Sequence, residues 1–199
     1  MNSCLVRLLS SRRIARETSR AVGAVRPAST QAIHTTSAEL ADEQYELKFH
    51  TLHEMITKST LRHRDRDLFG THLPSQDGDG AFEWTTYGDF GRRVALCRTA
   101  LKDLGVAQYS KVGIISNNRE EWAVTAAAVY SLNATMVPMY ESQRPSDWAH
   151  ILNDAGCCTL LVSTEEIYLK AKQETLPNAP LVRDVLCFDA PDDEPQSFR

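Results

Sequence analysis

The spacing of apolar residues predicts a short helix and two strands in the first part of the chain. Apolar residues three and four apart follow helical spacing over residues 52–62. Residues 68–72 and 82–85 read as strands, and the segment 77–80 between them has the alternating Asp and Gly residues of a turn. We therefore expect a helix followed by a β-hairpin.

A long helix is expected directly after the hairpin. Thr86 and Asp89 have the spacing of a capping box, in which each side chain bonds a free backbone N–H group at the start of the helix. Gly105 stands where a left-handed residue ends a helix. Between them, apolar residues step by four and three along one face, namely Phe90, Val94, Cys97, Leu101 and Leu104. Cys97 on this stripe is expected to be a small buried hydrophobe rather than a nucleophile.

From residue 112 onward, short apolar runs alternate with segments of helical spacing. Strands are expected at residues 112–116, 135–139, 159–162 and 185–188. The helices between them are expected to end at Asn133, to run from Pro145 to Gly156 and to span residues 165–174. Strands that alternate with helices pair in parallel, with helices covering the sheet. The sequence therefore predicts an α/β class, and Pro138 predicts a strand end or an edge strand.

Parallel sheets bind ligands beyond the carboxyl ends of their strands, so the turn at 116–119 and the loop at 140–144 are the places for a site. Asn117, Asn118 and Arg119 could hold a phosphate, because a helix N-terminus presents unpaired N–H groups. The same residues could instead cap the helix without a ligand, and Asn118 with Glu121 has a capping spacing. The chain contains no Walker phosphate loop and no GxGxxG motif.

Metal and nucleophilic chemistry have no support in the sequence. The five cysteines form no CxxC pair, and no Cys or His spacing indicates a metal site. An odd number of cysteines without such spacing fits a reducing compartment. No Ser lies in a GxSxG elbow. We therefore assign no catalytic residue and no metal ligand.

Charge is distributed unevenly along the chain. Residues 1–37 hold six Arg, no Lys and one acid, the composition of a mitochondrial transit peptide, although a disordered basic tail is the alternative. Residues 38–50 form an acidic linker. Beyond residue 37 the chain holds 16 of the 22 Lys and Arg residues and 25 of the 26 acids, which disfavours nucleic acid as a partner. No apolar run reaches the length of a membrane span, so any membrane association would be peripheral.

Six segments give the chain a resemblance to long-chain acyl-CoA synthetases, in the order and spacing of that family. They are Trp84–Tyr87, Leu104–Val106, Val112–Trp122, Val137–Glu141, Trp148–Asp154 and Leu160–Val162. The resemblance covers roughly residues 50–190. It implies that residues 51–190 are the N-terminal lobe of the adenylate-forming fold and that 191–199 are a truncated acidic tail.

The resemblance also implies a reaction and its cofactors. Members of the family use ATP and Mg²⁺ to convert a fatty acid to an acyl-adenylate and then transfer the acyl group to coenzyme A. The family's phosphate loop, adenine contacts and second domain would lie beyond Arg199. We therefore expect this chain to be a scaffold, inactive alone, and a gene-model fragment of a mitochondrial long-chain fatty-acid ligase. The alternatives are a catalytically silent binding module and part of an adenylating ligase for shorter acids.

Overall fold

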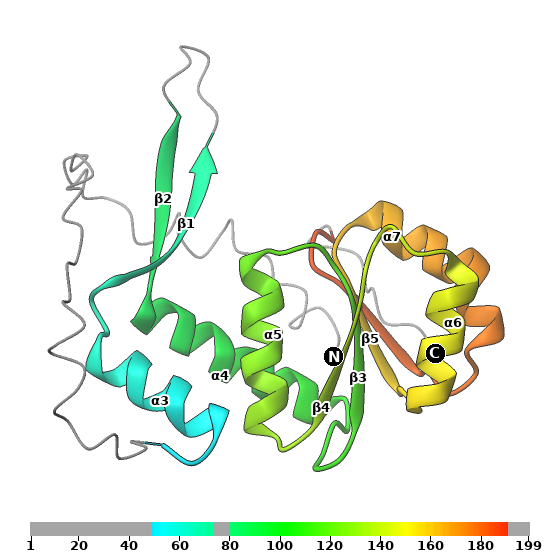
Figure 1. Ribbon diagram of the computed structural model, residues 1–199, viewed down its shortest axis with the longest axis horizontal. Coiled ribbons are helices and arrows are strands. Elements are labelled where there is room, and N and C mark those ends of the chain that lie inside the picture. The colour runs from blue at the N-terminus through cyan, green and yellow to red at the C-terminus, as the bar shows by residue number, and fades with distance from the viewer. Residues whose placement is uncertain (1–48, 74–79, 191–199) are drawn as a thin grey trace, which may run out of the picture.

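The computed structural model describes residues 49–73 and 80–190, and Figure 1 shows their arrangement. The predicted transit peptide, nearly all of the predicted linker, the predicted tail and the hairpin turn apart from Gly80 lie outside these residues. The first part consists of α3 (Leu52–Arg62), the hairpin strands β1 (Asp67–Leu73) and β2 (Ala81–Thr86), and α4 (Tyr87–Asp103).

The second part is a four-stranded parallel sheet with helices on both faces. Its strands are β3 (Lys111–Ile115), β4 (Thr135–Met139), β5 (Thr159–Val162) and β6 (Asp184–Cys187), in the order β4-β3-β5-β6. The helices are α5 (Glu120–Ser131), α6 (Pro145–Ala155), α7 (Glu165–Lys170), the π-helical η1 (Ala171–Thr175) and the 3-10 helix η2 (Leu176–Asn178). The predicted α/β class is confirmed, and Pro138 lies on the edge strand β4, as expected.

Two hydrophobic clusters hold this sheet, one on each face. Alternate residues of a strand point to opposite faces, so Val112 and Ile114 pack with α4 and α5, whereas Ile115 packs with α6 and α7. Helix α6 lies close to β3, one of the two inner strands of the sheet. A Cβ atom on Gly113 would come within 2.7 Å of Leu152 Cδ2, so a residue without a side chain permits this approach.

The apolar stripe of α4 is buried along the helix, as its spacing predicts, whereas Leu104, predicted as its last member, is the C-cap and is partly buried. Phe90, Val94, Cys97 and Leu101 all lie in the core. Thr86 Oγ1 accepts a hydrogen bond from Asp89 N at 3.1 Å, which confirms the cap at the start of α4. The Asp89 carboxylate accepts from the Thr86 hydroxyl rather than from its backbone N–H, so the reciprocal half of the capping box is replaced by a side-chain bond.

The β1–β2 hairpin projects from the rest of the molecule in Figure 1. Its lower end is anchored by Phe69, whose ring meets the edge of the Phe90 ring at 5.5 Å between centroids. Farther out, Gly70 is paired with Trp84, and the Trp84 ring lies over the glycine. An aromatic ring on the partner strand covers the position that has no side chain of its own.

Two local predictions differ from the structure. The predicted cap formed by Asn118 and Glu121 is wrong, because α5 begins at Glu120, its N-cap is Arg119, and no side chain caps it. The carboxylates of Glu120 and Glu121 in the first turn meet the positive end of the helix instead. The helix predicted over 165–174 ends as an α-helix at Lys170 and continues with π-type hydrogen bonding to Thr175.

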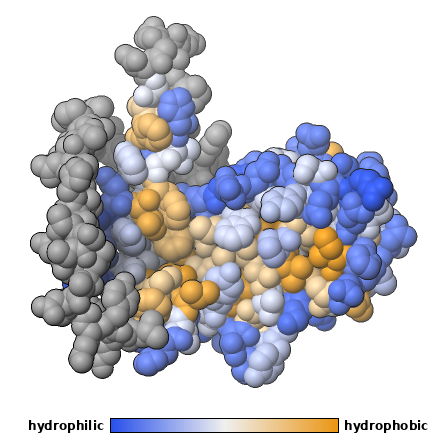
Figure 2. Space-filling model, in the orientation of Figure 1, coloured by the Kyte–Doolittle hydropathy of each residue, from blue (hydrophilic) through white to orange (hydrophobic). Residues whose placement is uncertain are grey.

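Figure 2 shows apolar residues gathered on one face, over α5 and the elements beside it. Helix α5 also carries three partly buried apolar side chains that pack against the core, namely Trp122, Ala123 and Tyr130. Within residues 49–73 and 80–190, no helix has both the length and the apolar composition needed to cross a bilayer.

Candidate functional site

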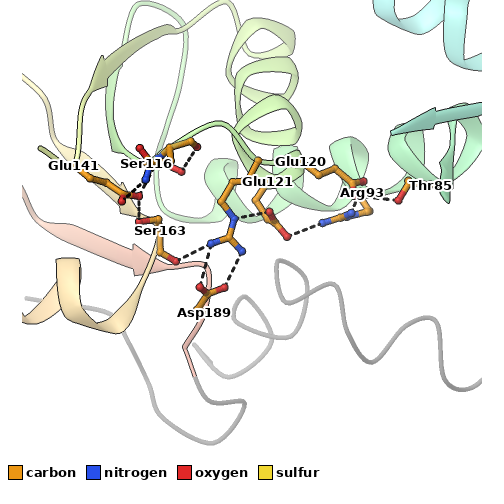
Figure 3. A network of polar contacts seen from close by, with 10 residues as sticks. Thr85, Arg93, Ser116, Glu120, Glu121, Glu141, Ser163 and Asp189 are labelled. Carbon is orange, nitrogen blue, oxygen red and sulfur yellow. Dashed lines mark hydrogen bonds and ion pairs between the residues drawn. The ribbon is translucent and has the colours of Figure 1, made fainter. Parts of the chain in front are cut away.

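The carboxyl ends of all four parallel strands meet at one edge of the sheet, where polar side chains form the network of Figure 3. Each strand is followed within two residues by a member of this network. These members are Asn117 after β3, Glu141 after β4, Ser163 after β5 and Asp189 after β6. Strand order therefore places side chains together that lie up to 72 residues apart in the sequence.

Glu141 is the centre of the first part of the network. Its carboxylate accepts hydrogen bonds from the backbone N–H of Asn117 at 2.9 Å and from Asn117 Nδ2 at 2.6 Å. The Ser163 hydroxyl donates a short third bond to the same carboxylate. Glu141 thus ties together the ends of β3, β4 and β5.

Arg119 is the centre of the second part. Its guanidinium donates to the Asp189 carboxylate through Nη1 at 3.1 Å and Nη2 at 2.8 Å. Nε donates to Glu121 at 2.7 Å, and Nη1 also reaches the Ser163 carbonyl at 3.3 Å. The pKa of Arg119 is raised, mainly by the hydrogen bonds to Asp189, and its charge is therefore permanent in the working pH range.

Arg93 connects this edge with α4 and the hairpin. It forms ion pairs with Glu120 and, at 3.4 Å, with Glu121, the first two residues of α5. Thr85 at the end of β2 donates a hydrogen bond of 3.0 Å to the other oxygen of Glu120. The network therefore runs from the base of the hairpin to the end of β6.

These contacts favour a structural role for Asn117 and Arg119 over the phosphate interpretation, although no side chain caps α5. The donors of Asn117 and Arg119 already bind carboxylates, and the Asn118 side chain is exposed. The network in Figure 3 holds four carboxylates and two arginines: Glu120, Glu121 and Asp189 pair with Arg93 or Arg119, and Glu141 binds Asn117 and Ser163. A triphosphate would have to displace carboxylates from Arg119 and would be repelled by the rest.

At this edge the donors of Asn117 and Arg119 that a phosphate would need are engaged by carboxylates. Within the two described ranges, no three metal-binding side chains lie together. Cys97 is buried, and this burial raises the pKa of its thiol to about 12, so the thiol is a poor nucleophile at neutral pH, as the sequence predicts. The phosphate assignment to Asn117, Asn118 and Arg119 stays a prediction.

Sequence reasoning located the edge but missed most of the partners. The turn at 116–119 and the loop at 140–144 do meet there, and Glu141 lies in that loop. Ser163 and Asp189 could have been found by the same rule, because each follows the end of a predicted strand. No local sequence pattern marked Arg93 as a member of the network, because its partners depend on how α4 packs against α5.

Solved structures define the class of this fold. The coronafacic acid ligase of Pectobacterium brasiliense aligns with 74% of this chain and 28% of its own, at a TM-score of 0.61 and 15% identity. The adenylation domain of a carboxylate reductase from Mycobacterium chelonae aligns with 76% of this chain and 25% of its own, at a TM-score of 0.61 and 20% identity. The fold is therefore that of the adenylate-forming enzymes.

Sequence comparison gives the family itself. Residues 61–198 match the family described as AMP-binding enzyme, and the chain belongs to that family. Fatty acyl-CoA synthetase B of Dictyostelium discoideum is 30% identical over 176 residues, 86% of this chain and 25% of that protein. The peroxisomal long chain acyl-CoA synthetase 6 of Arabidopsis thaliana is 29% identical over 136 residues, 68% of this chain and 19% of that protein. The chain thus spans a quarter or less of the length of these two relatives.

Proposed function

We propose that this chain is the N-terminal lobe of a long-chain fatty-acid CoA ligase and that it serves as a scaffold within that enzyme. The observation that carries the proposal is the match to AMP-binding enzymes over 61–198, together with curated relatives named as long-chain acyl-CoA synthetases and ligases. In this reaction the fatty-acid carboxylate displaces pyrophosphate from ATP to give an acyl-adenylate, and the thiol of coenzyme A then displaces AMP to give acyl-CoA.

The scaffold role follows from what the carboxyl edge contains. Its arginines are engaged by carboxylates, so the groups that bind ATP, Mg²⁺ and coenzyme A would come from elsewhere in the enzyme. Figure 2 shows apolar residues gathered over α5, and a large apolar patch of a protein surface often marks a place that another part of a protein covers. A longer polypeptide of the same family would supply that cover.

The transcript and the activity of its product test the proposal. We expect the reading frame to continue beyond residue 199, and the encoded protein to form palmitoyl-CoA and release pyrophosphate with ATP, coenzyme A and magnesium. Acetate and benzoate, tested as competing acids, should be poor substrates. Preference for either would favour a ligase for shorter acids, and a confirmed stop after residue 199 would favour a silent binding module.

The 199-residue chain gives a second, independent measurement. Purified alone, it should release no pyrophosphate above a no-protein control, with or without residues 1–37. Arg119→Ala is the informative variant, because Arg119 is the nearest basic residue to a helix N-terminus at this edge. Turnover that Arg119→Ala abolishes would contradict the scaffold role.

We also propose that residues 1–37 direct the protein to mitochondria and are then removed. The support is compositional, namely six Arg, no Lys and a single acid in this segment. Residues 1–37 fused to a fluorescent protein should reach mitochondria and lose the segment. The matched control replaces Arg12, Arg16 and Arg20 with Gln, and should stay in the cytosol. Diffuse signal from the unchanged segment would reject the proposal.

A further inference from the structure

The chain leaves β6 through three residues whose side chains alternate between the core and the edge of the sheet. Phe188 and Ala190 are buried, and the Phe188 N–H donates to Val162 O at 2.9 Å, which extends the pairing with β5 by one residue. Asp189 between them points outward to Arg119, as Figure 3 shows for Asp189. The direction of the chain at this point is therefore tied to one arginine.

Arg119 holds this segment in a way that only a guanidinium permits. Two parallel N–H bonds engage both oxygens of Asp189, while Nε engages Glu121 on α5. The guanidinium carbon also lies 5.6 Å from the centre of the Phe188 ring. A lysine has one charged nitrogen and could not keep the two-bond contact together with the bond to Glu121.

The ion pair between Arg119 and Asp189 is too exposed to solvent to contribute much to the stability of the fold. The Arg119 side chain is 28% exposed and the Asp189 side chain is 47% exposed. Ion pairs at such exposure contribute little to the free energy of unfolding. The contact instead determines how the ends of three strands are placed relative to one another. Arg119 follows β3, and it binds the Ser163 carbonyl after β5 and the Asp189 carboxylate after β6.

We propose that Arg119 is a positioning residue, which fixes the direction in which the chain leaves β6 and so aligns the part of the enzyme that follows against the carboxyl edge of the sheet. The effect on activity rests on the proposed ligase function. The effect on the chain itself does not, so the two can be tested separately.

The first test measures amide hydrogen exchange by mass spectrometry on the 199-residue chain. We expect Arg119→Lys and Asp189→Asn each to speed exchange in the peptide 186–190 by about fivefold or more, with β3 unchanged, because a local contact opens without global unfolding. Arg144→Lys is the matched control, since Arg144 also donates two bonds, at 3.1 and 3.2 Å, to the carboxylate of Asp147, three residues away. It should leave the peptide 186–190 unchanged.

Two exchange results would overturn the proposal. One is equal exchange of residues 186–190 in wild type, Arg119→Lys and Asp189→Asn. The other is faster exchange across β3 and β5 as well, which would mean that Arg119 only stabilises the sheet.

The second test uses the longer enzyme and palmitate. We expect Arg119→Lys to lower kcat/KM by about tenfold, as misplacement of a site does, with the melting temperature within about 2 °C of wild type. Arg92→Lys should keep wild-type kcat/KM, since Arg92 pairs with Asp89 at the exposed surface of α4. An unchanged kcat/KM in Arg119→Lys would contradict the proposal that Arg119 aligns the part of the enzyme after β6 with the carboxyl edge of the sheet. An inactive wild-type enzyme would instead refute the ligase function and leave the exchange experiment to decide the role of Arg119.

Discussion

Arg93 and Glu120 form an ion pair between α4 and the first residue of α5, with only 13% and 11% of their side chains exposed. Glu121 approaches the same guanidinium, so one cation on α4 serves two carboxylates at the start of α5. Because α4 also packs on the hairpin, this pair links the first part of the molecule to the start of α5.

Arg93→Ala should therefore destabilise the fold by about 3 kcal/mol, because it leaves Glu120 buried without its cation. The neighbouring Arg92 is the control, since it pairs with Asp89 at the surface of the same helix. Arg92→Ala should change the free energy of unfolding by less than about 1 kcal/mol. Urea unfolding of both variants measures the difference, and equal losses would show that the Arg93 pair is not buried in solution.

Leu101→Asp should destabilise the fold by about 4 kcal/mol or more, because a charge would enter the core without a partner. Leu101 is 1% exposed in the cluster between α4 and the sheet. Leu96 on the same helix is 38% exposed, so Leu96→Asp should cost less than about 1 kcal/mol. Thermal melting followed by circular dichroism compares them. Wild-type melting of Leu101→Asp would mean that the stripe is not packed.

Cys97 predicts a pH dependence of stability above pH 9. Burial raises the pKa of its thiol from 9.0 to about 12 in the folded protein. Between these values the thiol ionises in the unfolded chain but stays protonated in the folded one. Its contribution to stability is therefore complete below pH 9 and declines as the pH rises, by about 1.4 kcal/mol per pH unit.

Two variants isolate this effect from the other titrating groups. The difference in free energy of unfolding between wild type and Cys97→Ala should shrink by about 1.4 kcal/mol from pH 8 to pH 10, because only wild type carries the thiol. Val94→Ala removes a buried side chain that does not titrate, from the same stripe. Its difference from wild type should be the same at both pH values. Parallel behaviour of the two variants would contradict the raised pKa.

Gly156→Ala should destabilise the fold by about 1 kcal/mol, because Gly156 ends α6 with φ of 70°, in the left-handed region. A Cβ atom there would meet no neighbour within 4 Å, so the cost would come from the backbone alone. Gly156→Asn is the control and should cost less, since Asn tolerates this conformation. Urea unfolding distinguishes them. An equal loss in both variants would point to a cause other than the backbone.

Most of the fold was predictable from the sequence because its elements depend on local signals. The cap at Thr86, the stripe of α4 and the left-handed glycines at 105 and 156 each act within one or two helical turns. Strands with apolar runs between helices fix the parallel α/β class. The cap predicted at Asn118 failed because α5 begins one residue later, with Arg119 as its N-cap. Arg119 itself is held by Asp189, 70 residues away, and no local pattern records that contact.

The sequence by itself thus determined where the helices and strands form, which faces they bury and at which edge of the sheet polar groups collect. Only the tertiary structure decided that Arg119 meets Asp189, that Glu141 meets Asn117 and Ser163, and that Arg93 lies between Glu120 and Glu121. The physical reason is that helix caps and apolar periodicity act over a few residues. The partner of a charged side chain depends instead on the order of strands and the packing of helices, which bring distant residues within hydrogen-bonding distance.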